Sequence, residues 1–205
     1  MKENRIILVS RIVSAVFTPF YLPLVGLIAL FLFSYLNMMP LVYKLTVLIM
    51  VHIFTVLLPS MLIRLYRKSQ GWTLWQISIK ERRVVPYIIS IACYFTCYYI
   101  FNIYNFPHFM SSILLAALAI QMICAVVNVW WKVSTHSAAI GGVAGALVAF
   151  SFIFAFNPTW WLCLVIILAG MVGTSRMILR QHSLAQVVVG FLIGVAVAFF
   201  IIRYF

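Results

Sequence analysis

The sequence predicts an all-α protein, a polytopic bundle of about six or seven transmembrane helices that forms one membrane domain over residues 1–205. Hydrophobic residues make up 66% of the chain, whereas charged residues make up 8%. The chain contains many apolar runs close to the roughly 20 residues that a helix needs to cross a bilayer. Several links between these runs are short and rich in Asn and Pro, which is typical of tight turns between antiparallel helices.

The apolar runs predict seven spans in chain order. Three of their links, near Asn37, Pro107 and Pro158, are short and almost uncharged, so each predicts a tight hairpin. The first run is interrupted by Pro19 and Pro23, and it lacks a small-residue cleavage pattern. We therefore expect it to be a retained span rather than a removed signal peptide. The expected spans cover residues 12–36, 41–65, 86–105, 109–131, 138–156, 159–174 and 183–204.

The remaining links, residues 64–86, 132–137 and 175–182, carry most of the polar side chains. Two spans separate the first of these links from the second, and two more separate the second from the third. An even number of crossings returns a chain to the same side of the membrane. The parity therefore predicts that all three polar links lie at one membrane surface, where they can form one composite site.

The charge of the chain is strongly positive, with a net charge of +12 from 14 Lys and Arg against two acidic residues, Glu3 and Glu81. The chain contains no Asp, so carboxylate pairs, EF-hand loops and aspartate-bound magnesium are excluded. The excess of cations suits anionic lipid headgroups or a phosphorylated substrate rather than nucleic acid. Only Lys44 and Arg203 are expected opposite the polar links, and the positive-inside rule then favours a cytoplasmic site.

Several residues outside the polar links have simpler explanations. Cys93, Cys97, Cys124 and Cys163 fall in apolar segments without a Cys-x-x-Cys pair, so we expect small buried hydrophobic side chains rather than a metal or redox site. His52 and His108 are expected to be packing or interfacial residues, and Gln121 and Asn128 are expected to form hydrogen bonds between helices. The tryptophans are expected to form an aromatic belt at the membrane interface.

The polar links combine cations and hydroxyls with two histidines, His136 and His182. Converging positive charges are costly beside hydrocarbon unless an anion joins them. A tetrahedral phosphate fits this requirement, because the arginine fork matches its oxygens and the amides of a helix N-terminus add donors. The two histidines supply a nucleophile and an acid for the leaving oxygen. The pattern indicates phosphate-transfer chemistry.

Three segments of the chain resemble the signatures of the phosphatidic acid phosphatase type 2 superfamily. SRMILRQH, residues 175–182, matches the third signature, Ser-Arg followed by five residues and His. KVSTHS, residues 132–137, is similar to the second, and KERRVVP, residues 80–86, resembles a shortened first signature. Their order and the number of helices between them also agree with the family. The resemblance covers about residues 79–194, a phosphatase-like core preceded by N-terminal spans in residues 1–66.

The resemblance implies roles for individual residues. His182 is implied to be the nucleophile that forms a phosphohistidine, and His136 the acid that protonates the leaving alkoxide and later helps to activate water. Gln186 takes the place of the residue that orients the nucleophile. The family's phosphatases need no metal and no cofactor. The residues implied to hold the phosphate oxygens are Lys80, Arg83, Ser134, Thr135 and Arg176.

The chain departs from the family pattern at three places. Gln186 replaces an Asp, so it orients the imidazole without stabilising an imidazolium as a carboxylate does. Val133 and Thr135 replace the usual Pro and Gly of the second signature. Lys80 and Arg83 are three residues apart rather than seven, which leaves the choice of phosphate ligand open among them and Arg82. We expect a slower or differently tuned enzyme.

The function expected from the resemblance is an integral-membrane hydrolase of a lipid phosphate monoester or diphosphate. Phosphatidic acid, phosphatidylglycerophosphate and polyprenyl diphosphate all fit, and the partners expected are the substrate lipid and the bilayer, with the oligomeric state open. The hydrophobicity argues against the soluble haloperoxidase branch, and a bacterial inner membrane is the favoured location. Two alternatives remain: a catalytically weak protein that binds or transports lipid phosphate, and a structural multispanning protein whose polar links only set topology.

Overall fold

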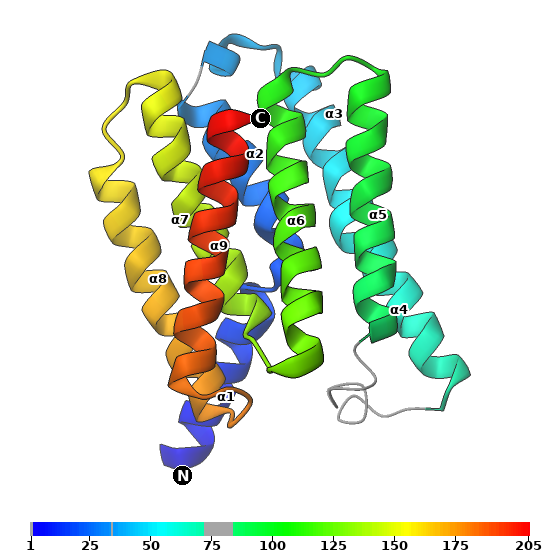
Figure 1. Ribbon diagram of the computed structural model, residues 1–205, viewed down its shortest axis with the longest axis vertical. Coiled ribbons are helices and arrows are strands. Elements are labelled where there is room, and N and C mark those ends of the chain that lie inside the picture. Colours follow the sequence, from blue (N-terminus) through cyan, green and yellow to red (C-terminus); the bar gives the residue numbers. More distant parts are fainter. Residues whose placement is uncertain (1, 34, 72–83) are drawn as a thin grey trace.

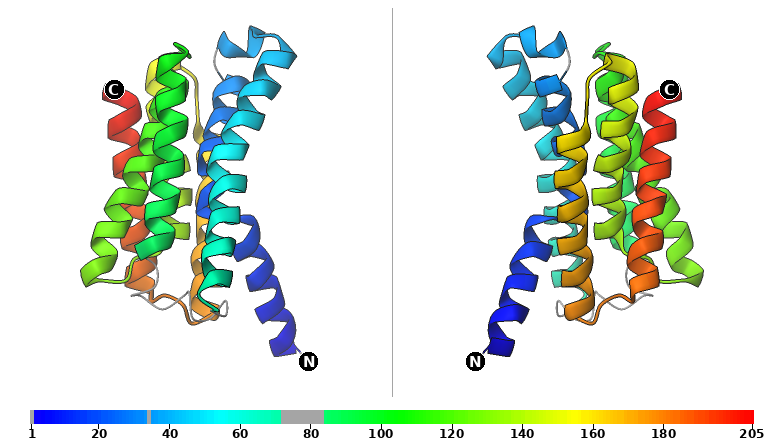
Figure 2. Two further views of the ribbon diagram at one scale, coloured as in Figure 1. Left: turned by 90° about the vertical axis from the view of Figure 1, so that its right-hand side faces the viewer. Right: turned by 90° about the vertical axis from the view of Figure 1, so that its left-hand side faces the viewer.

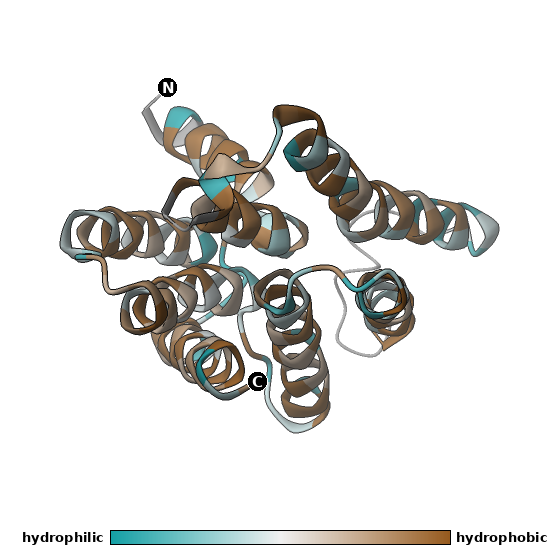
Figure 3. Cartoon of the chain, turned by 90° about the horizontal axis from the view of Figure 1, so that it is seen from above, coloured by the Kyte–Doolittle hydropathy of each residue, from teal (hydrophilic) through white to brown (hydrophobic). Residues whose placement is uncertain are grey.

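The computed structural model describes residues 2–33, 35–71 and 84–205, and this part of the chain is a bundle of long antiparallel helices (Figure 1). Seven helical segments of the described residues are long and apolar enough to cross a membrane, which confirms the predicted all-α membrane fold. Figure 3 shows hydrophobic residues along most of the ribbon, with hydrophilic residues mainly near the ends of helices. The spans are Arg5–Leu32, Leu41–Ser69, Val84–Ile103, His108–Trp130, Thr135–Phe154, Thr159–Ile178 and Leu184–Tyr204.

The first two spans are not continuous α-helices. The first consists of α1, Lys2–Val16, and α2, Leu22–Phe33, with a short 3-10 turn, η1, Pro19–Tyr21, between them. Pro19 breaks the helix because it lacks the N–H that the helix interior needs, and α1 diverges from the bundle below this break (Figure 2). The second span joins α3, Leu41–His52, to α4, Leu58–Ser69, through a π-helical segment, η3, Ile53–Leu57.

The last five spans are regular helices whose ends match the predicted links within a few residues. They are α5, Val84–Ile103; α6, His108–Trp130; α7, Thr135–Phe154; α8, Thr159–Ile178; and α9, Leu184–Tyr204. Two of them extend further than predicted, because α7 begins at Thr135 and α8 continues to Ile178. His136 and Arg176 therefore lie within the terminal turns of helices rather than in loops.

The closest helix pair is α7 with α9, and glycines make this approach possible. Gly141 and Gly145 of α7 lie directly against the backbone of α9, at Phe191 and Val195. Gly194 of α9 lies in the same way against the carbonyl of Ala138. Small residues let two helix backbones approach without a side chain between them. This packing joins α7, which carries His136, to α9, which begins two residues after His182.

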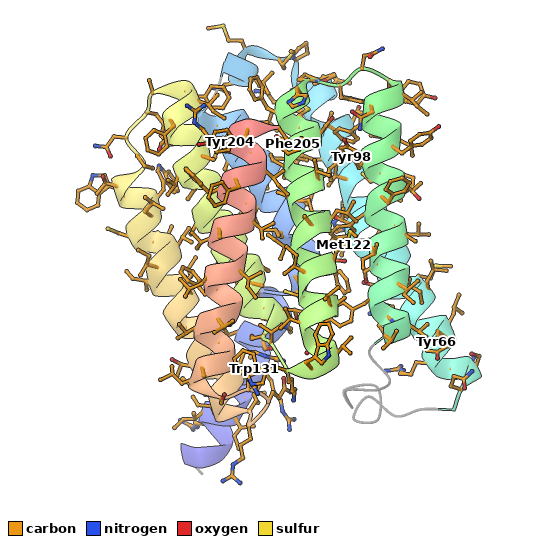
Figure 4. All side chains as sticks on the ribbon, viewed as in Figure 1. Tyr66, Tyr98, Met122, Trp131, Tyr204 and Phe205 are labelled. Atoms are coloured by element: carbon orange, nitrogen blue, oxygen red, sulfur yellow. The ribbon has the colours of Figure 1, made fainter. Side chains whose placement is uncertain are left out.

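The two termini of the chain lie at opposite ends of the helical bundle. The N-terminus, the α4 end, the α6–α7 link and the α8–α9 link lie at one end, and the C-terminus lies at the other (Figure 1). Aromatic residues lie near both ends, with Tyr66 and Trp131 at the first end and Tyr204 and Phe205 at the second (Figure 4). Such rings suit the two membrane interfaces. We call the first end the site end, because the second and third sequence motifs both lie there.

Candidate active site

The second motif is held in place by a network that begins in α6. Asn128, buried near the end of α6, accepts a hydrogen bond from the Val133 backbone N–H at 3.2 Å and donates one to the Tyr87 hydroxyl at 2.9 Å. The same amide therefore joins α5, α6 and the link that precedes α7. This bears out the expected interhelical role of Asn128. The hydrogen bond from Val133 also fixes the backbone of the link that leads into α7 and His136.

Ser134 caps the N-terminus of α7. Its hydroxyl oxygen accepts hydrogen bonds from the Ser137 N–H at 3.3 Å and from the Ser137 hydroxyl at 2.9 Å, and the residue is fully buried. Capping orients the first turn of the helix, where the amides of Thr135 and His136 lie at the positive end of the helix dipole. His136 is half-buried. The second motif thus offers an imidazole beside a helix end suited to anions.

The third motif lies across the end of α8 and the start of α9. Arg176, in the last turn of α8, is 7% exposed, and its Nη1 donates to the Ser14 hydroxyl of α1 at 2.5 Å. The helix then ends in a Schellman motif, in which Gln181 N–H reaches the Arg176 carbonyl and Arg180 N–H reaches that of Met177. Arg180 adopts a left-handed conformation with φ 52°. This reversal brings His182 back to the bundle, where it is 7% exposed.

His182 has a defined partner in the first turn of α9. Its Nδ1 lies 3.2 Å from Oε1 of Gln186, and the same oxygen accepts the Ser183 backbone N–H at 3.2 Å. The Ser183 N–H is always a donor, so the Gln186 atom facing it must be the amide oxygen. An oxygen that only accepts requires a proton on Nδ1 of His182. In the neutral ring, this tautomer carries the lone pair on Nε2, the atom that a histidine nucleophile would use.

The capping box of α9 accounts for the position of Gln186. The Ser183 hydroxyl accepts the Gln186 N–H at 3.4 Å, and the Gln186 side chain returns to the Ser183 N–H. This reciprocal pair satisfies two donors of the helix N-terminus. The residue that replaces the family's Asp therefore has a structural role as well as a contact with the imidazole.

The second and third motifs are joined directly. The Ser134 backbone N–H donates to the Gln186 carbonyl at 3.2 Å. Gly190, one turn further along α9, permits this contact, because a Cβ atom there would lie 2.6 Å from the Ser134 carbonyl oxygen. The structure thus brings Ser134, Thr135 and His136 to the same end as Arg176, His182 and Gln186. Lys80, Arg82 and Arg83 of the first motif lie outside the described residues.

Two residues that support the site were not predicted from the sequence. Ser14 accepts a hydrogen bond from Arg176 although it lies on a helix remote in the chain, and no motif marks it. Tyr87 accepts a hydrogen bond from Asn128. Each depends on a contact between distant segments. The cysteine expectation holds for Cys93, Cys97 and Cys124, which are buried, but Cys163 is exposed.

The fold and this cluster define a polytopic helical membrane protein with a histidine- and arginine-containing site at one end of its bundle. The family model described as the PAP2 superfamily matches residues 128–205, which run from Asn128 through α7, α8 and α9. The search of curated proteins and the search of solved structures gave no significant match. This match supports a phosphatase-type function on lipid phosphates in general.

Proposed function

We propose that the protein is a metal-independent lipid phosphatase that hydrolyses a phosphate monoester or diphosphate at a membrane interface through a phosphohistidine. The observation that carries the proposal is the contact of His182 Nδ1 with Gln186 Oε1 at 3.2 Å, together with the Ser183 N–H on the same oxygen. In a neutral His182, this contact puts the ring proton on Nδ1 and leaves the Nε2 lone pair to attack phosphorus.

The first step forms a bond between His182 Nε2 and phosphorus and breaks the bond from phosphorus to the ester oxygen. His136 gives its proton to the leaving alkoxide. Arg176, the first amides of α7 at Thr135, and Lys80 or Arg83 stabilise the phosphoryl oxygens as charge builds on them. Ser134 contributes by capping that helix end.

The second step releases phosphate. His136, now neutral, takes a proton from water as the water oxygen bonds to phosphorus, and the bond from phosphorus to His182 breaks. Both histidines are then back in their starting states, with His182 neutral and His136 protonated. The substrate is phosphatidic acid, phosphatidylglycerophosphate or a polyprenyl diphosphate. The whole chain forms a single membrane domain, and its site faces the cytoplasm.

Release of inorganic phosphate from dihexanoyl phosphatidic acid by the purified protein, with a metal chelator present, tests the proposal. The wild type is expected to turn over, whereas His182→Ala is expected to be inactive. Arg176→Lys, which keeps a charge but not the bidentate fork, should retain weak activity. A wild type without turnover, or a His182→Ala variant with undiminished turnover, would contradict the proposal.

A second candidate is a lipid-phosphate binding or transport protein that retains the anion site. The neutral amide of Gln186 favours it, because an amide does not stabilise the imidazolium that a carboxylate would. This candidate predicts that the wild type binds the substrate lipid without releasing phosphate, and that Arg176→Ala weakens the binding. The turnover assay therefore separates the two candidates.

A further inference from the structure

A cavity of about 1110 Å³ lies along η3 and α4, and we call it the α4 cavity. Its lining follows one face of this span from Ile53 to Gly71, with residues that recur every three or four positions. Among the residues that the structure describes, none of His136, Arg176 and His182 lines it. The α4 cavity is therefore separate from the candidate active site, and it lies outside the part of the chain that matches the family model.

The lining of the α4 cavity changes from apolar to cationic along the helix. Leu57 and Met61 come first, and Arg64, Arg67 and Lys68 follow within the last two turns of α4. Since α4 ends at the site end of the bundle (Figure 1), the cations lie nearer the membrane surface than the apolar residues do. A phospholipid has the same order, with its charged headgroup at the surface and its acyl chains below.

The three cations have no acidic neighbour in the described lining of the α4 cavity. The chain's two acidic residues are Glu3, on α1, and Glu81, which lies outside the described residues. Arg67 is half-buried, so its charge is partly withdrawn from water. Positive charges that converge beside apolar surface are unfavourable unless an anion joins them. The lining is therefore complementary in charge to an anionic ligand.

The α4 cavity is also open towards the bilayer. Leu57 is 53% exposed and Met61 is 58% exposed, although both line the cavity. In a membrane such side chains face hydrocarbon, so an acyl chain can lie along them without crossing water. A free phosphate ion would use the cationic end alone. The apolar face therefore favours a lipid over a small anion.

We propose that the α4 cavity binds an anionic phospholipid of the surrounding leaflet. The phosphate lies among Arg64, Arg67 and Lys68, and an acyl chain lies along the face at Leu57 and Met61. The lipid is bound rather than hydrolysed, so this site goes beyond the proposed function and does not depend on it. Anionic lipids are characteristic of the cytoplasmic leaflet, which the site end is expected to face. A lipid that binds only the folded chain stabilises it.

Thermal unfolding of the purified full chain in a nonionic detergent, followed by circular dichroism, tests the proposal. Dioleoyl phosphatidylserine is the probe, because its phosphodiester is neither a substrate nor a product of the proposed hydrolysis. It is expected to raise the unfolding midpoint of the wild type saturably. Dioleoyl phosphatidylcholine, which has the same chains but no net charge, should leave the midpoint unchanged. Inorganic phosphate should also leave it unchanged, because it has no acyl chain to cover the apolar face.

Substitutions on α4 should weaken this response through the loss of charge. Arg64→Gln and Arg67→Gln are each expected to raise the phosphatidylserine concentration for half-maximal stabilisation by roughly fivefold, the contribution of one cation near an anionic headgroup. Arg67→Lys keeps the charge and should stay within about twofold of wild type. The matched control is Arg11→Gln, because Arg11 is exposed on α1 towards the same end but does not line the cavity. It should respond to the lipid as the wild type does.

The outcomes separate a lipid site from a general effect of charge. An equal rise with phosphatidylcholine, or an equally weakened response in Arg11→Gln, would overturn the site. A rise with inorganic phosphate alone would overturn the assignment to a lipid. The proposed phosphatase function fails or holds separately, since hydrolysis of dihexanoyl phosphatidic acid is measured without phosphatidylserine. Arg64→Gln and Arg67→Gln should leave that hydrolysis within about twofold of wild type.

Discussion

Gln186 shows how one side chain can serve both a helix and a candidate nucleophile. Its amide oxygen accepts the Ser183 N–H and faces Nδ1 of His182, so a single atom completes the capping box and selects the imidazole tautomer. A carboxylate would do the same and would also stabilise positive charge on the ring during reaction. The amide supplies orientation alone.

Substitution of Gln186 separates these contributions. Gln186→Ala removes the acceptor, so kcat is expected to fall by roughly a hundredfold or more as the imidazole loses its tautomer. Gln186→Glu keeps the length and both acceptor contacts, and its kcat should equal or exceed that of the wild type. The measurement is steady-state hydrolysis of dihexanoyl phosphatidic acid. Identical kcat values for all three forms would remove any orienting role.

Ser14 extends the candidate site into a helix that the family model does not match. The hydroxyl accepts from Arg176 Nη1, and both residues are buried. Ser14→Ala removes this acceptor, so the guanidinium is held less firmly and KM is expected to rise roughly tenfold with a smaller change in kcat. Ser10→Ala provides the control, because Ser10 is buried on α1 one turn earlier. Equal KM values for Ser14→Ala and wild type would show that Arg176 does not depend on this contact.

At the scale of helices, the α7–α9 contact determines whether the second and third motifs meet. His136 lies in the first turn of α7, and His182 lies two residues before α9 begins at Leu184. The glycines between them contact opposing backbone directly, so an added methyl group has no flexible side chain to displace. Rigid backbone contacts transmit such an insertion to the whole interface.

Alanine at Gly194 tests this dependence. The new Cβ would overlap the Ala138 carbonyl, and the free energy of unfolding is expected to fall by about 3 kcal/mol, with loss of turnover as the helices separate. Gly170→Ala is the matched control on α8, where no atom outside the helix lies within 4 Å of the added carbon. It should be neutral or stabilising by up to about 1 kcal/mol. Thermal unfolding in detergent measures both, and equal midpoints for the two variants would contradict the packing argument.

The sequence predicted those elements whose signals are local. Apolar runs predicted the seven spans, and the Pro- and Asn-containing links predicted their hairpins, because length and turn chemistry act within a few residues. The break at Pro19 was visible as a proline within a run, but the π-helical segment Ile53–Leu57 has no comparable signal. The early start of α7 depends on the Ser134 cap, which a boundary drawn by hydrophobicity misses.

The candidate site was predictable only where its residues belong to a motif. His136, Arg176, His182 and Gln186 could be named because their segments resemble the family's signatures, and their common end followed from the parity of the spans. Ser14 could not be named, since a serine on an apolar helix carries no sign of its partner 162 residues away. A cavity of about 1160 Å³, lined by His136 and by residues of α2, α3 and α8, was equally hidden, because each helix face that lines it resembles an ordinary lipid-facing or core stripe.

At the scale of the whole molecule, charge is distributed unequally between the two ends. Arg5, Arg11, Arg64, Arg67 and Lys68 lie on α1 or α4 towards the site end, apart from the phosphate motifs. Lys44 and Arg203 belong to the opposite end. Cations near the ends of spans favour the cytoplasmic side of the membrane. Since residues without a proposed catalytic role share this bias, we expect the site end to face the cytoplasm.

Reporter fusions at the C-terminus test this orientation, because Phe205 lies at the end opposite the site (Figure 1). In a bacterial host, alkaline phosphatase fused there should be active and green fluorescent protein should be dark, since the fusion point would be outside the cytoplasm. A fusion after Gly71, at the α4 end, should give the opposite pair of signals. Neutralising Arg64, Arg67 and Lys68 to Gln should weaken the bias, because positive charge beside the second span retains that end in the cytoplasm. A fluorescent C-terminal fusion would place the site on the outer face, where it would act on lipids of the other leaflet.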